Sequence, residues 1–144
     1  MLVALDGSEP ANRALDFALD MANKYSSEVL LFTVIQPITI PYFIYEEMPT
    51  PIEADSYSRR LEAYYKNILS EALEKVKKEK PTLKVSTKVE EGRPADKIVQ
   101  AAKDEGCDII IMGSQGLSGV KELLLGSVSN RVADKATCPV LIVK

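Results

Sequence analysis

Residues 108–130 read D-I-I-I-M-G-S-Q-G-L-S-G-V-K-E-L-L-L-G-S-V-S-N, and this stretch is the best guide to the fold. It opens with an apolar run from Ile109 to Met112 that is typical of a buried strand. Three glycines then interrupt the pattern, and a helical pattern begins at Gly126 and Ser127. A strand, a glycine-rich loop and a helix start, in this order, predict an anion-binding loop.

The glycine loop suits a phosphate group for two physical reasons. Glycine carries no side chain that would keep an anion away from the backbone N–H groups. A helix N-terminus adds N–H groups without intrahelical partners and a favourable dipole. The loop has neither the Gly-Lys-Ser/Thr of a P-loop nor the spacing of the dinucleotide-binding fingerprint. The residues alone therefore leave two interpretations open: a nucleotide phosphate site, or a glycine-rich turn that only precedes a helix.

The rest of the chain alternates between strand patterns and helix patterns. Strands are expected at residues 2–5, 28–35, 83–90, 108–112 and 139–143. The intervening helices are expected to begin near residues 8, 57, 94 and 126. This alternation predicts one α/β domain over residues 1–144, with a parallel sheet and right-handed crossovers. The first, fourth and fifth strands are almost wholly apolar and are expected in the middle, whereas the alternating third strand is expected at an edge.

Asp6 directly follows the first predicted strand, as Gly113 follows the fourth. In open parallel sheets, ligands bind beyond the carboxyl ends of the strands, where the strand order reverses. If the first and fourth strands are neighbours, Asp6 and Gly113 flank one crevice. An acidic residue ahead of a helix can also simply cap it, so this second role for Asp6 stays open.

Composition excludes several classes of protein. The 18 basic and 21 acidic side chains give a net charge of −3, which does not favour nucleic acid or an anionic membrane as partner. The absence of histidine excludes Ser-His-Asp and Cys-His catalysis within one chain. No apolar run approaches the ~20 residues of a membrane span. Cys107 and Cys138 form no metal motif and are expected as apolar filler at strand starts, in keeping with a reducing cytoplasm.

Residues 36–54 differ in kind from the rest, since they hold four of the eight prolines. We expect a long loop here, acting as a lid, as an interaction surface or simply as a mobile segment. Tyr64 and Tyr65 occur in the helical pattern that follows. Their spacing favours packing in a core or an interface over stacking on a ligand.

The spacing of the loop resembles a family motif. Gly113-x-x-Gly116, nine further residues and then Gly126-Ser127 are similar to the G-2x-G-9x-G-S/T motif of ATP-binding universal stress proteins. Three other segments are also similar to sequences that are typical of that family: V-A-L-D-G-S-E (3–9), E-G-R-P-A-D-K-I (91–98) and C-P-V-L-I-V (138–143). The resemblance covers essentially the whole chain.

The resemblance implies a doubly wound sheet of five parallel strands in the order 3-2-1-4-5. It implies a homodimer that pairs the last strand, Pro139 to Val143, with its twin. It also implies bound ATP, with Mg or Mn as the accompanying metal. The nucleotide contacts that it implies are Ala4, Leu5, Asp6, Val34, Met112, Gly113, Gly116, Gly126, Ser127, Val128 and Ser129.

The resemblance also implies which part of the nucleotide each of these residues would contact. The glycines and residues 127–129 would hold the phosphates. Ala4, Leu5 and Asp6 would line the adenosine side, with the carboxylate on the ribose or on a metal-bound water. Val34 and Met112 would complete the base pocket.

The sequence is compatible with three functions. The first is an ATP-binding regulatory module whose conformation or partner depends on the nucleotide. The second is a slow ATPase or a self-phosphorylating protein that uses Ser127 or Ser129. Only Lys121 and Arg131 provide positive charge near the loop, so fast phosphoryl transfer is not expected. The third is a binding module without nucleotide.

Overall fold

The computed structural model describes residues 1–36, 51–117 and 125–144, with the backbone alone described for residues 51–54. Lys121 and residues 37–50 of the predicted long loop lie outside the described residues. Five strands form one parallel sheet in the order β3-β2-β1-β4-β5, which confirms the predicted α/β fold and strand order. The strands are β1 (Leu2–Ala4), β2 (Val29–Ile35), β3 (Val85–Glu91), β4 (Ile110–Gly113) and β5 (Val140–Val143).

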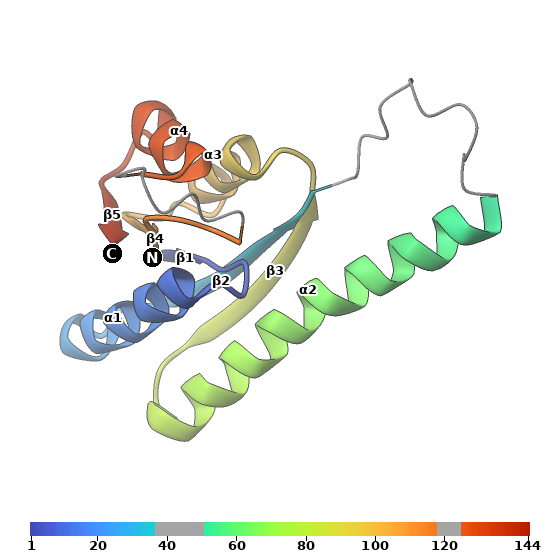
Figure 1. Ribbon diagram of the computed structural model, residues 1–144. Helices are drawn as coiled ribbons and strands as arrows, with labels where there is room; N and C mark the ends of the chain where they lie inside the picture. Colours follow the sequence, from blue (N-terminus) through green and yellow to red (C-terminus); the bar gives the residue numbers. More distant parts are fainter. Residues whose placement is uncertain (37–50, 118–124) are drawn as a thin grey trace.

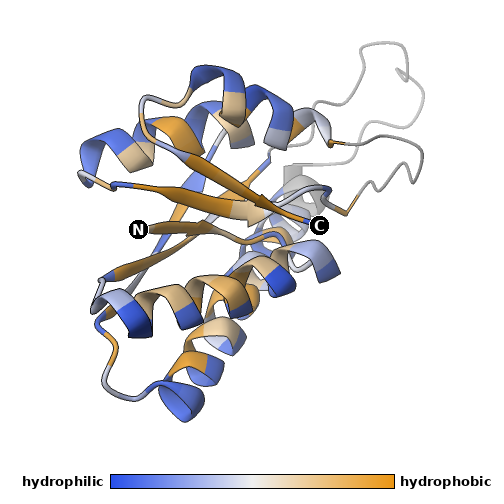
Figure 2. Cartoon of the chain, turned by 90° about the vertical axis from the view of Figure 1, so that its left-hand side faces the viewer, coloured by the Kyte–Doolittle hydropathy of each residue, from blue (hydrophilic) through white to orange (hydrophobic). Residues whose placement is uncertain are grey.

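Helices cover both faces of the sheet (Figure 1). They are α1 (Glu9–Tyr25), α2 (Pro51–Glu79), α3 (Pro94–Asp104) and α4 (Ser127–Lys135). Two apolar cores result, one under α1 and α2 and the other under α3 and α4. Figure 2 shows the apolar strands between these two layers. The sheet thus buries apolar side chains on both faces, as its nearly continuous apolar strands predict.

The pairing of β1 with β4 places the site. Leu2 pairs with Ile110 and Ala4 with Met112, so the two strands end side by side. The chain leaves β1 toward one face and leaves β4 toward the other, because α1 and α4 cover opposite faces. The strand order therefore reverses at this point, and the predicted adjacency of Asp6 and Gly113 is confirmed at the carboxyl ends of the strands.

Helix α1 begins where its sequence predicts, and a left-handed residue ends it. The Ser8 hydroxyl accepts a hydrogen bond of 3.3 Å from the backbone N–H of Ala11 and so caps the first turn. Ser26, with φ at 51°, ends the helix in the left-handed conformation. The apolar face is fully buried, and its members are Ala11, Ala14, Leu15, Ala18, Leu19 and Ala22.

Two expectations about position need correction. The fifth strand was expected in the middle, but β5 lies at an edge and all four of its residues are only partly buried. β2 takes an inner place instead, and its first six residues are buried. The edge position of β3 is as predicted. An apolar run shows that a strand needs covering, but not whether the cover is another strand, a helix or a second molecule.

The helix expected from about Tyr57 begins earlier, at Pro51. Residues 51–54, expected as loop, are therefore helical. Proline suits the first helical position, because its missing N–H would have no partner there and its φ is already helical. The prolines of this segment favoured a loop in the sequence, yet the last of them starts a helix.

The described residues hold no helix that is both long and apolar enough to cross a membrane. Cys107 and Cys138 are free thiols and are partly buried against the core under α3 and α4. Burial raises the pKa of the Cys107 thiol, which disfavours the reactive thiolate. This agrees with the expected role as apolar filler at strand starts, although the strand after Cys138 is not itself fully buried.

Candidate functional site

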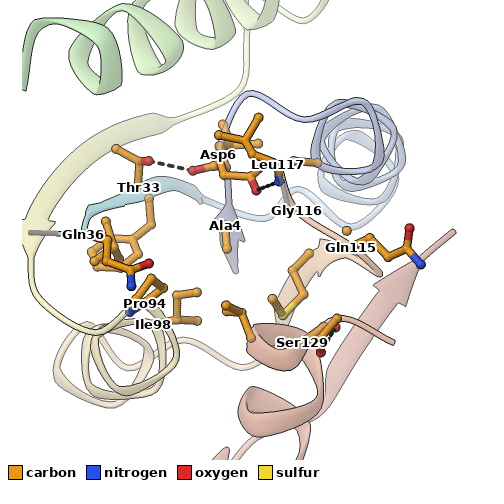
Figure 3. A pocket seen from close by; sticks show the side chains of 18 of the residues that line it. Ala4, Asp6, Thr33, Gln36, Pro94, Ile98, Gln115, Gly116, Leu117 and Ser129 are labelled. Carbon is orange, nitrogen blue, oxygen red and sulfur yellow. Dashed lines mark hydrogen bonds between the residues drawn. The ribbon is translucent and has the colours of Figure 1, made fainter. Parts of the chain in front are cut away.

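Asp6 ties together two segments that are far apart in the sequence. Its Oδ1 accepts a hydrogen bond of 2.9 Å from the backbone N–H of Ser8, within the turn that leads into α1. Its Oδ2 accepts one of 3.3 Å from the backbone N–H of Leu117, in the loop after β4 (Figure 3). The cap of α1 is Ser8 itself. Asp6 therefore does more than support a helix start, because it also holds the glycine loop against the end of β1.

The N-terminus of α4 faces the same space and has no side-chain cap. Gly126 is its N-cap residue and offers no side chain, so no cap hydrogen bond forms. The Gly126 backbone instead donates to the carbonyl of Ser114 at 2.7 Å, which fixes the helix start beside the end of β4. Uncapped N–H groups at a helix N-terminus, together with the helix dipole, form a site for an anion.

The two serines of α4 differ in what their hydroxyls can do. Ser127 is exposed at the first turn. Ser129 is 2% exposed, and its hydroxyl lies 2.8 Å from the carbonyl of Ser114 and 3.0 Å from that of Gly126. The Ser129 proton is thus engaged within the protein, whereas its backbone N–H belongs to the helix start. Of the two residues, Ser127 is the one that is exposed where it lines the cavity.

Two motif glycines pack closely against backbone atoms, and at Gly113 this packing itself requires a glycine. A Cβ atom at Gly113 would lie 2.7 Å from the backbone carbon of Pro10, at the start of α1. One at Gly126 would lie 3.2 Å from the carbonyl oxygen of Ser114. Helix α1 packs closely on β4 only because residue 113 has no side chain. The sequence suggested that these positions are glycine so that a phosphate can approach the backbone. Close packing of the backbone is a second reason.

The space between these elements is a cavity of about 260 Å³. All eleven residues predicted from the sequence line it: Ala4, Leu5, Asp6, Val34, Met112, Gly113, Gly116, Gly126, Ser127, Val128 and Ser129. They come from the ends of β1, β2 and β4 and from the start of α4. The structure thus brings the whole predicted set together in one cavity.

Further lining residues were missed from the sequence. The ones that bear on chemistry are Thr33, Gln36, Tyr65, Pro94, Ile98 and Gln115. Gln36 follows β2 directly, so the rule that ligands meet the carboxyl ends of strands could have indicated it. Pro94 and Ile98 belong to a segment that the family resemblance had already singled out. Nothing in the sequence indicated that Tyr65 lines a cavity, because its helical spacing favoured packing in a core or an interface.

Tyr65 reaches the cavity from α2 and lines it together with Asp6. Burial raises the pKa of the Tyr65 phenol above its ordinary value, and the carboxylate of Asp6 raises it further. The ring of Tyr64 packs edge-on against that of Tyr65, with ring centroids 5.5 Å apart. The hydroxyl of Tyr65 is therefore a neutral donor beside an acidic group. Among the described lining residues, Asp6 is the only charged side chain.

Comparison with known proteins identifies this architecture. The sequence profile of the Universal stress protein family matches residues 1–144. The chain belongs to the universal stress protein family. A curated universal stress protein, YxiE of Bacillus subtilis, is 34% identical over 155 residues, covering 100% of this chain and 97% of YxiE.

Solved structures agree with the fold of this universal stress protein. That of MJ0577, a protein of Methanocaldococcus jannaschii, is 35% identical and aligns with a TM-score of 0.70, covering 99% of this chain and 93% of that one. A universal stress protein in complex with cAMP is 26% identical, with a TM-score of 0.68, covering 99% of this chain and 94% of that one. The universal stress protein fold accounts for the five-stranded order described above.

Proposed function

We propose that this protein is an ATP-binding regulatory module, whose conformation or choice of partner depends on the bound nucleotide. The observation that carries the proposal is the meeting of all eleven predicted contact residues in one cavity at the strand-order reversal. A related universal stress protein in complex with cAMP supports a nucleotide as the ligand class.

The phosphates would lie at the polar end of the cavity. This end is formed by Gly116, by Gly126 and by the uncapped start of α4. Backbone N–H groups at a helix start hold an anion without the need for a cationic side chain. The hydroxyl of Ser127 adds a donor that is exposed at the same position. The binding energy for the phosphates thus comes from the backbone.

Mg or Mn would accompany the nucleotide. The described residues contain no group of three or more acidic, cysteine or histidine side chains that could hold a metal ion by themselves. The Asp6 carboxylate lies in the cavity and could supply one protein ligand. A divalent ion held by one carboxylate and by the nucleotide's phosphates is the usual arrangement for Mg²⁺.

The cavity favours holding ATP over hydrolysing it. Phosphoryl transfer relies on positive charge placed around the γ-phosphate. Within the part of the chain that the structure describes, no lysine or arginine lines the cavity. The alternative, a slow ATPase or self-phosphorylation at Ser127, would be supported by phosphate release above background that Asp6→Ala abolishes.

We also propose a homodimer in the cytoplasm. The apolar strand β5 is partly exposed at an edge of the sheet, and pairing with its twin would cover it. The free thiols of Cys107 and Cys138 suit a reducing compartment.

Titration calorimetry with ATP tests the proposed function. Wild type is expected to bind, and ATP at 100 times Kd should raise the free energy of unfolding by about 2.7 kcal/mol. Gly126→Val is expected to lose binding, because the side chain would occupy the phosphate path. Gly106→Asn is the matched control, since no atom lies within 4 Å of a Cβ there and asparagine tolerates its left-handed φ of +61°. Undiminished binding by Gly126→Val would contradict the loop assignment.

Native mass spectrometry of the purified protein provides an independent test. Bound ATP or AMP is the expected cargo. A protein that carries no nucleotide and whose melting temperature does not rise with ATP would instead be a binding module without nucleotide.

A further inference from the structure

The cavity has two ends of different chemistry. One end is polar and formed by the glycine loop and the start of α4. The other end is apolar and is lined by Phe32, Val34, Pro94, Ile98 and Met112. A nucleotide has the same asymmetry, with anionic phosphates at one end and a flat apolar base at the other. With the phosphates on α4, the base lies at the apolar end.

Gln36 places an amide at this apolar end. It directly follows β2, which ends at Ile35 within the apolar side of the cavity. Figure 3 shows the Gln36 side chain beside Pro94 and Ile98, across the cavity from Ser129. The residue is exposed, so its amide lies at the rim and not deep within the core.

The other polar side chains of the cavity have partners or lie elsewhere. The Thr33 hydroxyl donates to the carbonyl oxygen of Leu5 at 2.6 Å, and Thr33 is only 1% exposed. Tyr65 reaches the cavity from α2, on the opposite face of the sheet from Pro94 and Ile98. Gln115 lies across the cavity from Gln36, on the side of Ser129 (Figure 3). Ser129 donates to backbone carbonyls at the other end. Among the described side chains at the apolar end, Gln36 is therefore the one that can offer both a donor and an acceptor to a base.

We infer that the Gln36 amide reads the edge of the base and makes the site prefer adenine to guanine. This inference rests on the proposed nucleotide function and adds the residue that sets its base specificity. The amide oxygen accepts from the N6 amino group of adenine, while the amide N–H donates to the neighbouring ring nitrogen. A single oriented polar group in an otherwise apolar pocket is a usual source of ligand specificity.

Guanine breaks this pairing because it carries an oxygen where adenine has the amino group. On the N7 edge, guanine presents two acceptors, and the amide oxygen then faces an acceptor. A carboxylate at residue 36 could still accept from the amino group of adenine, but on the same edge of guanine it would meet only acceptors. Replacing the amide by a carboxylate should therefore weaken the binding of both nucleotides and keep the preference for adenine, whereas removing the amide should weaken that preference.

The experiment measures Kd for ATP and for GTP by titration calorimetry on three variants and wild type. Wild type is expected to bind ATP about tenfold or more tightly than GTP, within the range that one bidentate pair contributes. Gln36→Ala should bring the ratio of the two Kd values close to one, whereas Gln36→Glu should weaken the binding of both nucleotides and leave ATP preferred. Gln100→Ala is the matched control, because Gln100 is an exposed glutamine on α3 that bonds to Asp104 and does not line the cavity.

The outcomes separate the inference from the function on which it rests. If wild type prefers ATP and Gln36→Ala keeps the same ratio of Kd values for ATP and GTP, the role inferred for Gln36 is contradicted and the nucleotide function stands. If wild type binds neither nucleotide, both are wrong. Without ligand, the four proteins should have equal melting temperatures, because residues 36 and 100 are exposed. Any change in the ratio of the Kd values for ATP and GTP then arises at the binding site.

Discussion

A Cβ atom on residue 116 would lie 2.5 Å from Oδ2 of Asp6, so the carboxylate occupies the space that only a glycine leaves open. The same oxygen accepts the hydrogen bond from the N–H of Leu117. The glycine at 116 thus lets the loop approach the end of β1 closely enough for Asp6 to hold it. The two residues act as one contact between the two halves of the site.

This contact predicts the behaviour of Gly116→Ala. The added methyl group should displace the Asp6 carboxylate, break its hydrogen bond to Leu117 and lower the free energy of unfolding by about 1 kcal/mol, the usual contribution of one hydrogen bond. ATP affinity should fall with it. The double variant Asp6→Ala, Gly116→Ala removes the clash, so urea denaturation should show a cost smaller than the sum of the two single changes. Additive costs would mean that the two residues do not interact.

Gly113→Ala should destabilise the fold whether or not nucleotide is present. Its Cβ would lie within 2.8 Å of the backbone of Pro10 and Ala11, and backbone atoms at a helix start have little room to move. We expect a loss of about 1–3 kcal/mol in the free energy of unfolding, measured by urea denaturation. Gly106→Asn again serves as the control. A stability equal to that of wild type would show that α1 can shift away from β4 at little cost.

Tyr65 predicts a dependence of stability on alkaline pH. Its pKa is raised above the ordinary value of 10.0, so above that pH the folded chain holds the phenolic proton more tightly than the unfolded chain. The contribution of Tyr65 to stability is complete below pH 10 and falls as the pH rises through the raised pKa. Urea denaturation across this range should show a weaker fall for Tyr65→Phe. Tyr25→Phe, at an exposed tyrosine, should follow wild type.

The same phenol provides a probe of the proposed ligand. ATP would bring further negative charge close to Tyr65 and should raise its pKa again. Tyrosinate absorbance measured with and without ATP, as the difference between wild type and Tyr65→Phe, follows this pKa directly. An unchanged pKa at saturating ATP would place the nucleotide away from Tyr65 and Asp6.

The exposed edge of β5 predicts the assembly state. Sedimentation velocity should give twice the chain mass for wild type. Ile142→Lys places a charge on β5, and charges on an edge strand oppose pairing with a second strand, so this variant should sediment as a monomer. Thr87→Lys adds a lysine at an exposed position of the opposite edge strand, β3, and should remain a dimer. A monomeric wild type at all concentrations would exclude the dimer.

Much of the site was predictable because its positions follow from chain order. Once the strands alternate with helices, the residues after β1 and β4 must lie at the carboxyl ends of the strands. Asp6 and Gly113 could therefore be placed at the same end of the sheet, and their adjacency followed only if the first and fourth strands were neighbours, as the family resemblance implied. The spacing of the glycines then added Gly116 and Gly126, and the family resemblance added the contacts from β2.

The rest could not be predicted, because it depends on contacts between elements. The helical spacing of Tyr65 shows that it faces the body of the protein, but not that this turn of α2 lies over a cavity. The apolar sequence of β5 does not reveal that one side lacks a neighbour. Pro51 was counted with the loop because proline marks both loops and helix starts.

The packing of α1 on β4 has a consequence for recognising nucleotide binding in other chains of this fold. Residue 113 must be glycine for the sheet and the first helix to fit together, with or without a ligand. A chain that had lost its nucleotide could thus retain the first glycine of the motif for architectural reasons alone. Gly116 and Gly126 border the polar end of the cavity, and a Cβ atom there would meet only the Asp6 side chain or a contact of 3.2 Å, so these two glycines are the more discriminating signature of an anion site.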